Sequence, residues 1–239
     1  MRGSVLILAG TAEARAVCAA VRDLEVLASL AGATARPAAL GVPTRVGGFG
    51  GEAGFAAALA GMAAVLDATH PYAARISERA SRLCASRGLP YLRLMRAGWP
   101  ARRGWRVHAD AEAAARALPP GARVFLSVGP GSLAPFLGRG LHLICRRIDP
   151  APPRSGVTWV IGRPPFPVEA EAALFRAHGI TDLVTKDSGG PAAKLDAAEA
   201  LGIAVHVIAR PPPPPGEETD DIDRAIAFVR AHAADRDPG

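Results

Sequence analysis

Short apolar runs alternate with amphipathic stretches along most of the chain. Runs of this length are typical of strands buried on both faces, and the amphipathic stretches have the spacing of helices. The pattern predicts βα units around a parallel sheet. The predicted strands are residues 5–9, 26–30, 64–68, 91–94, 124–128, 141–145, 159–161, 183–185 and 205–208. The longer predicted helices are residues 12–22, 74–86, 167–178 and 220–233.

The passage over residues 97–104 contains Gly, Pro and Trp and has no periodicity, and the strand–helix pattern starts again after it. We therefore predict two domains, residues 1–98 and 99–239. The predicted fold class is α/β, with two Rossmann-like three-layer halves around parallel sheets and a cleft between them. Ligands of open α/β sheets bind beyond the carboxyl ends of the strands, and each motif below falls at such an end.

The first motif, LILAGTAEAR, joins the first predicted strand to a helix through Gly10 and Thr11. A helix N-terminus offers unpaired N–H groups and a partial positive charge, so it favours a phosphate. Gly10 lets the backbone approach a ligand, and Thr11 adds a hydroxyl group. The complete G-x-G-x-x-G fingerprint is absent, so a purely structural turn is an equal alternative.

The residues after the second predicted strand indicate whether the nucleotide carries a 2′-phosphate. An NAD site typically has an acidic residue there, which bonds the ribose 2′-hydroxyl. Residues 29–36 contain no carboxylate, and Ser29, Thr34 and Arg36 are suited to a 2′-phosphate instead. This favours NADPH over NADH, with an ordinary solvated loop as the alternative.

Two further segments of the first half are candidates for the same site. Residues 47–51 contain four glycines, and we predict that Gly48 and Gly50 let a flat ligand lie against the backbone, although a plain turn is the alternative. The third strand ends near Asp67, which is followed by Thr69, His70 and Tyr72, and together they are predicted to place an acid, a hydroxyl, an imidazole and an aromatic ring at the rim. No second His or Cys lies at ligand spacing, so we predict no metal site.

The second half has a matching cluster after the strand at 183–185, made of Lys186, Asp187, Ser188 and Gly189, with Lys194 nearby. The two lysines are the only ones in a chain that otherwise uses arginine. Their ammonium groups suit a carboxylate or phosphate ligand, and a helix-capping loop is the alternative interpretation.

The composition of the chain indicates which classes of ligand it can bind. The formal net charge is +6, but aromatic residues make up only 5% and no basic run contains interleaved aromatics, so a small anionic ligand fits better than nucleic acid. No apolar run is long enough to span a membrane, and the three cysteines are far apart, as in a reduced cytoplasmic protein.

Taken together, the motifs resemble those of the precorrin-6A reductase family of cobalamin biosynthesis, which includes cobalt-precorrin-6A reductases. The segments that carry the resemblance are LILAGTAEAR, SLAGATARP, RVGGFGG, LDATHPYA, LRLMRAGW, TKDSGG with Lys194, and IARPP. They occur in the family's order over nearly the whole chain. The chain departs from the family at Ala9, Ala12 and Ala33, where Gly, Thr and Arg are usual. Because the arginine usual at position 33 is absent, Arg36 or Arg45 would have to contact the phosphate in its place.

The resemblance implies an NADPH-dependent oxidoreductase that transfers a hydride to a precorrin-6A macrocycle and gives precorrin-6B. It implies NADPH on the first domain, at Gly10, Thr11, Ser29, Thr34, Arg36, Gly48, Gly50, Thr69 and His70. It implies the carboxylate-rich substrate on the second domain, at Lys186, Asp187, Ser188, Gly189 and Lys194, with Tyr72 from the first. His70 and Asp187 are the candidate catalytic proton donors. We expect a monomer or weak homo-oligomer. The alternatives are a cobalt-precorrin-6A reductase, a non-catalytic nucleotide or tetrapyrrole carrier, and a nucleotide-sugar enzyme.

Overall fold

The computed structural model describes residues 2–32 and 39–236, and it divides into two compact units. Unit 1 consists of Met1–Ala97 together with Pro211–Gly239, and unit 2 consists of Gly98–Arg210. The chain therefore passes between the units twice.

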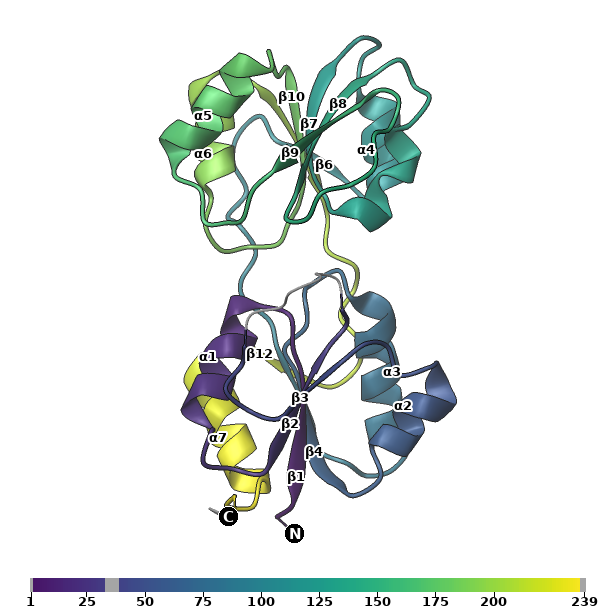
Figure 1. Cartoon of the computed structure of the whole chain (residues 1–239), viewed down its shortest axis with the longest axis vertical. Helices are drawn as coiled ribbons and strands as arrows, with labels where there is room; N and C mark the ends of the chain where they lie inside the picture. Colours follow the sequence, from purple (N-terminus) through teal and green to yellow (C-terminus); the bar gives the residue numbers. More distant parts are fainter. Residues whose placement is uncertain (1, 33–38, 237–239) are drawn as a thin grey trace. The chain divides into compact units, whose positions relative to one another are not determined.

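Among its described residues, unit 1 forms a six-stranded sheet in which all neighbouring strands are parallel (Figure 1). The spatial order is β12-β5-β4-β1-β2-β3, the order of a doubly wound dinucleotide-binding fold. Its topological switch point lies between β1 and β4. The strands are β1 (Ser4–Leu8), β2 (Val26–Leu30), β3 (Thr44–Val46), β4 (Met62–Asp67), β5 (Tyr91–Leu94) and β12 (Glu217–Thr219).

Helices cover both faces of this sheet (Figure 1). The side chains of β1 show why, since Val5 and Ile7 belong to the core under α1 and α7, while Leu6 and Leu8 belong to the core under α2 and α3. A strand buried on both faces needs apolar residues at every position, which is the pattern seen in the sequence. The helices of unit 1 are α1 (Ala12–Ala20), α2 (Glu52–Ala58), α3 (Ala74–Ala85) and α7 (Ile222–His232).

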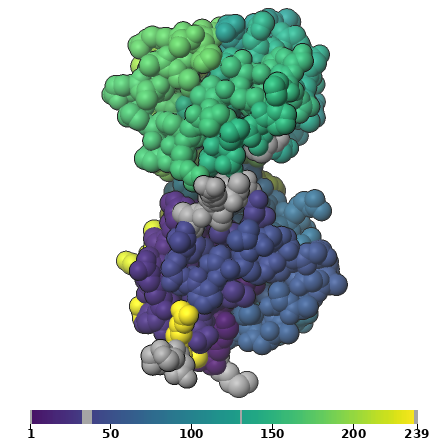
Figure 2. All heavy atoms as spheres, in the orientation of Figure 1, coloured from purple at the N-terminus to yellow at the C-terminus, as the bar shows by residue number. Residues whose placement is uncertain are grey.

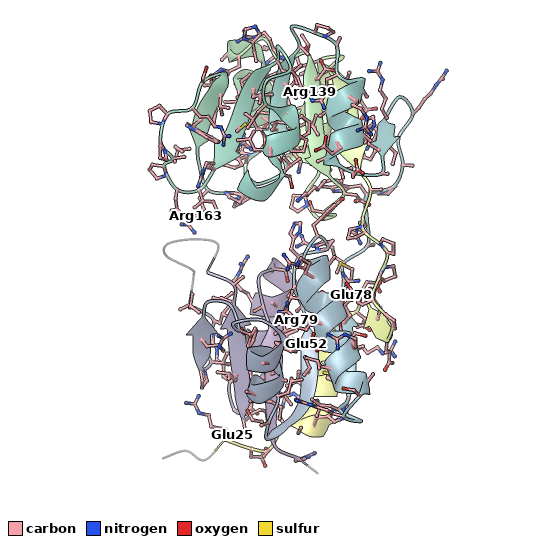
Figure 3. All side chains as sticks on the ribbon, turned by 90° about the vertical axis from the view of Figure 1, so that its right-hand side faces the viewer. Glu25, Glu52, Glu78, Arg79, Arg139 and Arg163 are labelled. Carbon is pink, nitrogen blue, oxygen red and sulfur yellow. The ribbon has the colours of Figure 1, made fainter. Side chains whose placement is uncertain are left out.

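Polar contacts join α2 to α3 at the surface. The Arg82 guanidinium donates to both carboxylate oxygens of Glu52, at 3.1 and 2.6 Å. These hydrogen bonds and the Arg82 charge, together with the charge of Arg79, lower the pKa of Glu52. Figure 3 shows Glu52 and Arg79 close together on these two helices.

Unit 2, described over its whole length, repeats this architecture. All of its strands are parallel, in the order β6-β11-β10-β7-β8-β9, with a switch point between β7 and β10. Helix α4 covers one face and α5 and α6 cover the other (Figure 1). The strands are β6 (Arg106–His108), β7 (Arg123–Ser127), β8 (His142–Arg147), β9 (Val157–Ile161), β10 (Asp182–Lys186) and β11 (Ala204–Ile208). The helices are α4 (Ala111–Ala117), α5 (Val168–Ala177) and α6 (Ala193–Ala200), with short 3₁₀ turns at Pro130–Ser132 and Ala134–Phe136.

The sheet of unit 1 takes one edge strand from beyond the second crossing, since β12 follows that crossing and pairs with β5. The sheet of unit 2 is built from one continuous segment, and its edge strand β6 pairs with β11. The expected second domain of residues 99–239 is therefore wrong at its C-terminal end, because residues 211–239 belong to unit 1. The physical reason is burial, since Ala225 and Val229 of α7 are completely buried in the core that also contains α1.

The predicted α/β fold with two parallel-sheet halves is confirmed, but three strands were not predicted. Strands β3, β6 and β12 are three residues long and lie at sheet edges. Their side chains are largely exposed, as Val46 at 55% and Val107 at 64% illustrate, so they need no apolar run. Within the described residues, no helix combines the length and apolar character that crossing a membrane requires.

Candidate functional site

The turn between β1 and α1 is anchored by Thr11. Thr11 is the N-cap of α1, and its buried hydroxyl accepts a hydrogen bond from the backbone N–H of Ala14 at 3.1 Å. The same hydroxyl donates to the carbonyl oxygen of Ala68, just beyond β4, at 3.0 Å. The Thr11 side chain thus joins the two strand ends at the switch point. An anion at this turn would meet the backbone N–H groups of the first turn of α1.

Open space lies in front of this turn. Gly10 is exposed, has a φ of +156°, and a Cβ atom built on it would meet nothing within 4 Å. Glu13, in the first turn of α1, would repel an anion, but its carboxylate pairs with the Arg96 guanidinium at 3.1 Å. The ion pair offsets the one acidic charge that the first turn of α1 carries.

Arg45 organises the glycine-rich loop beside the end of β2. Its guanidinium donates to the Ser29 hydroxyl at 2.8 Å and to the carbonyl oxygens of Gly47 and Gly48 at 3.1 and 2.9 Å. It also lies over the Phe49 ring, 3.9 Å from the ring centroid. The loop lies at the surface of unit 1 (Figure 2, dark blue). A cation is thereby fixed at the strand end where a dinucleotide fold binds the adenosine ribose.

A buried hydrogen-bond network forms the end of β4. Asp67 is fully buried, and its carboxylate accepts from the Thr69 N–H at 3.1 Å, the Thr69 hydroxyl at 2.7 Å and the Tyr91 hydroxyl at 2.9 Å. The Thr69 hydroxyl also lies 3.2 Å from that of Ser77 in α3. Burial, followed by the negative charge of Asp67, raises the pKa of Tyr91 far above its usual range. Asp67 therefore fixes the loop after β4 and does not reach the rim, where the sequence placed it.

His70 and Tyr72 follow this network on the loop between β4 and α3. His70 is exposed, and its Nδ1 accepts from the Tyr72 N–H at 3.3 Å. The two rings lie 5.7 Å apart. When neutral, an imidazole that accepts at Nδ1 carries its proton on Nε2. The ring thus has a defined tautomer at the edge of the switch point.

Asp187, the corresponding acid after β10, contacts both segments that lead to the other unit. Its Oδ1 accepts from the Trp99 N–H at 3.0 Å, and its Oδ2 lies 3.5 Å from Nε of Arg210. Gly98 packs so closely that a Cβ atom there would lie 2.6 Å from Oδ2. Asp187 is therefore a positioning residue for the two crossings, a role that its strand-end location did not reveal.

Lys194 and Trp99 form a second contact at this end of unit 2. The Lys194 ammonium lies over the Trp99 ring, 4.6 Å from its centroid, and the indole N–H donates to the carbonyl oxygen of Gly190 at 2.8 Å. Burial lowers the pKa of Lys194 to about 8 against the favourable charge of Glu171, and burial also lowers the pKa of Lys186. Both are cations that a carboxylate ligand would stabilise.

The structure therefore brings the predicted residues together in two groups. In unit 1, Gly10, Thr11, Thr69 and His70 meet at the switch point, Ser29 and Gly48 meet around Arg45, and Gly50 lies in the same loop. In unit 2, Lys186 ends β10 and is followed by Asp187, Ser188 and Gly189, and the Ser188 N–H donates to the Lys186 carbonyl oxygen at 2.7 Å.

Two predicted residues, Thr34 and Arg36, lie outside the described residues. The roles of Arg96 and Tyr91 were not predicted, because their partners lie far away in the sequence.

The fold defines a two-unit α/β protein whose first unit has the strand order of a dinucleotide-binding fold. A family model described as "Precorrin-6x reductase CbiJ/CobK" matches residues 4–230. The precorrin-6A reductase of Rhodococcus erythropolis is 45% identical over 241 residues, covering 94% of this chain and 96% of the relative. That of Mycobacterium tuberculosis strain H37Rv is 40% identical over 236 residues, with 94% and 96% covered. A solved structure, "CobK precorrin-6A reductase", matches with a TM-score of 0.89 at 37% identity, covering 97% of each chain.

The chain belongs to the precorrin-6x reductase family. The resemblance seen in the motifs is confirmed, and with it the class of enzyme, an oxidoreductase of cobalamin biosynthesis.

Proposed function

We propose that the chain reduces precorrin-6A to precorrin-6B with NADPH as the hydride donor. The observation that carries the proposal is the Gly10–Thr11 turn beside Ala68 at the switch point of a dinucleotide-type sheet, in a chain 45% identical to a precorrin-6A reductase. We also propose that unit 1 binds the cofactor and that unit 2 binds the substrate, as expected from the sequence.

The residues of unit 1 fit NADPH. The first turn of α1 and the open space at Gly10 suit a pyrophosphate. Ser29 and Arg45 suit a 2′-phosphate, and no carboxylate in residues 2–32 and 39–236 pairs with Arg45. The expectation that Thr34 and Arg36 contribute to the same contact is retained as part of the proposal. When bound, NADPH supplies the hydride.

Reduction of a double bond needs a proton as well as a hydride. We assign the proton to Nε2 of His70, because Nδ1 is engaged by the Tyr72 N–H. The other candidate donor, Asp187, has a carboxylate that already accepts from Trp99 and faces Arg210. Tyr72, Ser188 and Gly189 would contact the substrate beside these groups.

Lys186 and Lys194 would bind carboxylates of the macrocycle. Each is a half-buried cation whose pKa is lowered by burial, so an anionic partner stabilises its charged form. Holding the macrocycle against the cofactor converts a bimolecular encounter into a positioned reaction.

A cobalt-free substrate is favoured over cobalt-precorrin-6A. Relatives named precorrin-6A reductase are 35–45% identical to this chain, whereas those named cobalt-precorrin-6A reductase are 29–31% identical.

The proposal is tested by mixing the protein with NADPH or NADH, with precorrin-6A, cobalt-precorrin-6A or no tetrapyrrole, and following the absorbance of the reduced nicotinamide. We expect oxidation only with a tetrapyrrole, fastest with NADPH and precorrin-6A. Absence of substrate-dependent oxidation would leave a non-catalytic carrier, and equal use of NADH would remove the 2′-phosphate assignment.

The proton donor is tested separately, by comparing turnover of His70→Ala and Asp187→Asn variants over a range of pH. We expect His70→Ala to lose the limb of the pH profile that belongs to the imidazole and Asp187→Asn to keep it. Wild-type turnover of His70→Ala at every pH would exclude His70 as the donor.

A further inference from the structure

Unit 2 contains a pocket that lies apart from the Lys186–Lys194 cluster. It is a shallow depression, open to solvent, at the carboxyl ends of β7, β8 and β9. Its walls include Val128, Gly129, Leu133, Cys145, Arg147 and Trp159. Because Leu126 and Cys145 alternate with Phe125 and Ile144, which face α5 and α6, the pocket lies on the α4 side of the sheet.

Two neighbouring arginines of β8 differ in whether their charge is balanced. Arg146 donates to both carboxylate oxygens of Glu171, at 2.6 and 2.8 Å. Arg147 instead lines the pocket and lies over the Trp159 ring, 5.3 Å from its centroid. Throughout unit 2 and the described part of unit 1, no carboxylate pairs with Arg147. The pocket thus has a cation without a counter-charge beside a flat aromatic wall.

The rest of the lining adds no negative charge. Cys145 forms part of the buried floor, and burial raises the pKa of its thiol to about 12, so the sulfur stays protonated. Leu133 and Val128 are buried and apolar. An anionic group would therefore meet one guanidinium, an indole face and an apolar floor.

A carboxylate on a small ring fits these walls better than a nucleotide does. Strand β7 is followed by a 3₁₀ turn at Pro130–Ser132, so no α-helix N-terminus is available there for a phosphate. The pocket is also open to solvent, so it suits a carboxylate at the edge of a larger molecule.

We propose that this pocket binds one carboxylate-bearing pyrrole ring of the tetrapyrrole substrate, with the carboxylate on Arg147 and the ring edge against Trp159. The inference rests on the proposed function, since it names a subsite for that substrate. It adds Arg147 and Trp159 to the residues that orient the macrocycle.

The test measures binding of uroporphyrin, a stable tetrapyrrole rich in carboxylates, to the full-length protein by titration of its visible absorbance. We expect Arg147→Gln to weaken binding about tenfold, because it removes one charge-assisted hydrogen-bonded contact. Arg147→Lys should lose less, since it keeps the charge but not the flat guanidinium. Arg176→Gln is the matched control, because Arg176 is exposed on α5 at the opposite face of the sheet.

Kinetics separate this inference from the proposed function. With precorrin-6A, Arg147→Gln should raise the KM for the tetrapyrrole about tenfold and leave the KM for NADPH unchanged. If the wild-type protein binds uroporphyrin through Arg147 but does not oxidise NADPH, the pocket stands and the proposed reaction fails. If precorrin-6A is reduced and Arg147→Gln behaves like Arg176→Gln, the reaction stands and the pocket assignment is overturned. ATP that binds wild type and not Arg147→Gln would also overturn it.

Discussion

The hydroxyl group of Thr11 donates a hydrogen bond to the carbonyl oxygen of Ala68, 57 positions further along the chain. The contact joins the loops after β1 and β4, which flank the proposed cofactor site. Because the same hydroxyl also caps α1, one side chain fixes both the helix N-terminus and its distance from the loop that carries His70.

Replacing Thr11 with Val should therefore lower the free energy of unfolding by about 2 kcal/mol, from the lost cap and the unpaired carbonyl of Ala68. Thr11→Ser retains the hydroxyl and should stay close to wild type. Urea denaturation measures both variants, and the KM for NADPH should rise only in the Val variant. Equal stability of the two variants would contradict the assigned contacts.

Replacing Arg45 with Gln should weaken NADPH more than NADH. The guanidinium donates a hydrogen bond to the Ser29 hydroxyl, and losing a charge-assisted contact to a 2′-phosphate costs about tenfold in affinity. The measurement is the ratio of kcat/KM for the two cofactors. A ratio unchanged from wild type would show that Arg45 only holds the loop at Gly47 and Gly48.

Substrate binding should weaken as the pH rises through about 8, the lowered pKa of Lys194. A carboxylate binds the charged ammonium, so the KM for the tetrapyrrole should be flat below this pH and rise above it. Lys194→Arg stays charged at all these pH values and should remove the dependence. A wild-type KM that is constant well above pH 8 would exclude a direct contact between Lys194 and the substrate.

A hydrogen-bonded chain of Asp182, His206 and His108 should make the free energy of unfolding depend on pH in the acidic range. His206 lies 3.1 Å from the Asp182 carboxylate and 2.9 Å from the His108 ring nitrogen, and it is fully buried. Burial lowers the pKa of His206, although the Asp182 carboxylate opposes the shift, and it lowers that of His108.

The unfolded chain therefore binds more protons than the folded one below the ordinary histidine pKa of about 6.5. Stability should be fully present above that value and fall as the pH drops towards the lowered pKa values. His206→Asn should be less stable at pH 8 but should lose less on acidification. Unfolding in urea at a series of pH values measures this, and parallel curves for the two proteins would contradict it.

The sequence predicted what depends on local pattern. The apolar run before Gly10 and the helix after Thr11 are close in the chain, so their spacing alone places a turn at the end of β1. The hydrogen bond from the Thr11 hydroxyl to Ala68 could not be predicted, because Ala68 follows β4, and the pairing of β4 with β1 is a property of the folded sheet.

Contacts between distant segments could not be predicted from the sequence. The hydrogen bond between Asp187 and Trp99 is an example, because Trp99 precedes Asp187 by 88 residues. The pair Arg146–Arg147 directly follows the predicted strand at 141–145 and was a visible signal, but only the fold shows that Glu171 balances the charge of Arg146 and not that of Arg147.

The return of the chain to unit 1 sets the order in which the two units can be completed during synthesis. Residues 211–239 leave the ribosome after residues 98–210, so α7 and β12 reach unit 1 only after all of unit 2 has been translated. Until then the apolar face of α1 lacks the side chains of Ala225 and Val229 that bury it. Unit 1 is therefore completed after unit 2, and the nascent protein carries an uncovered hydrophobic surface while unit 2 is translated.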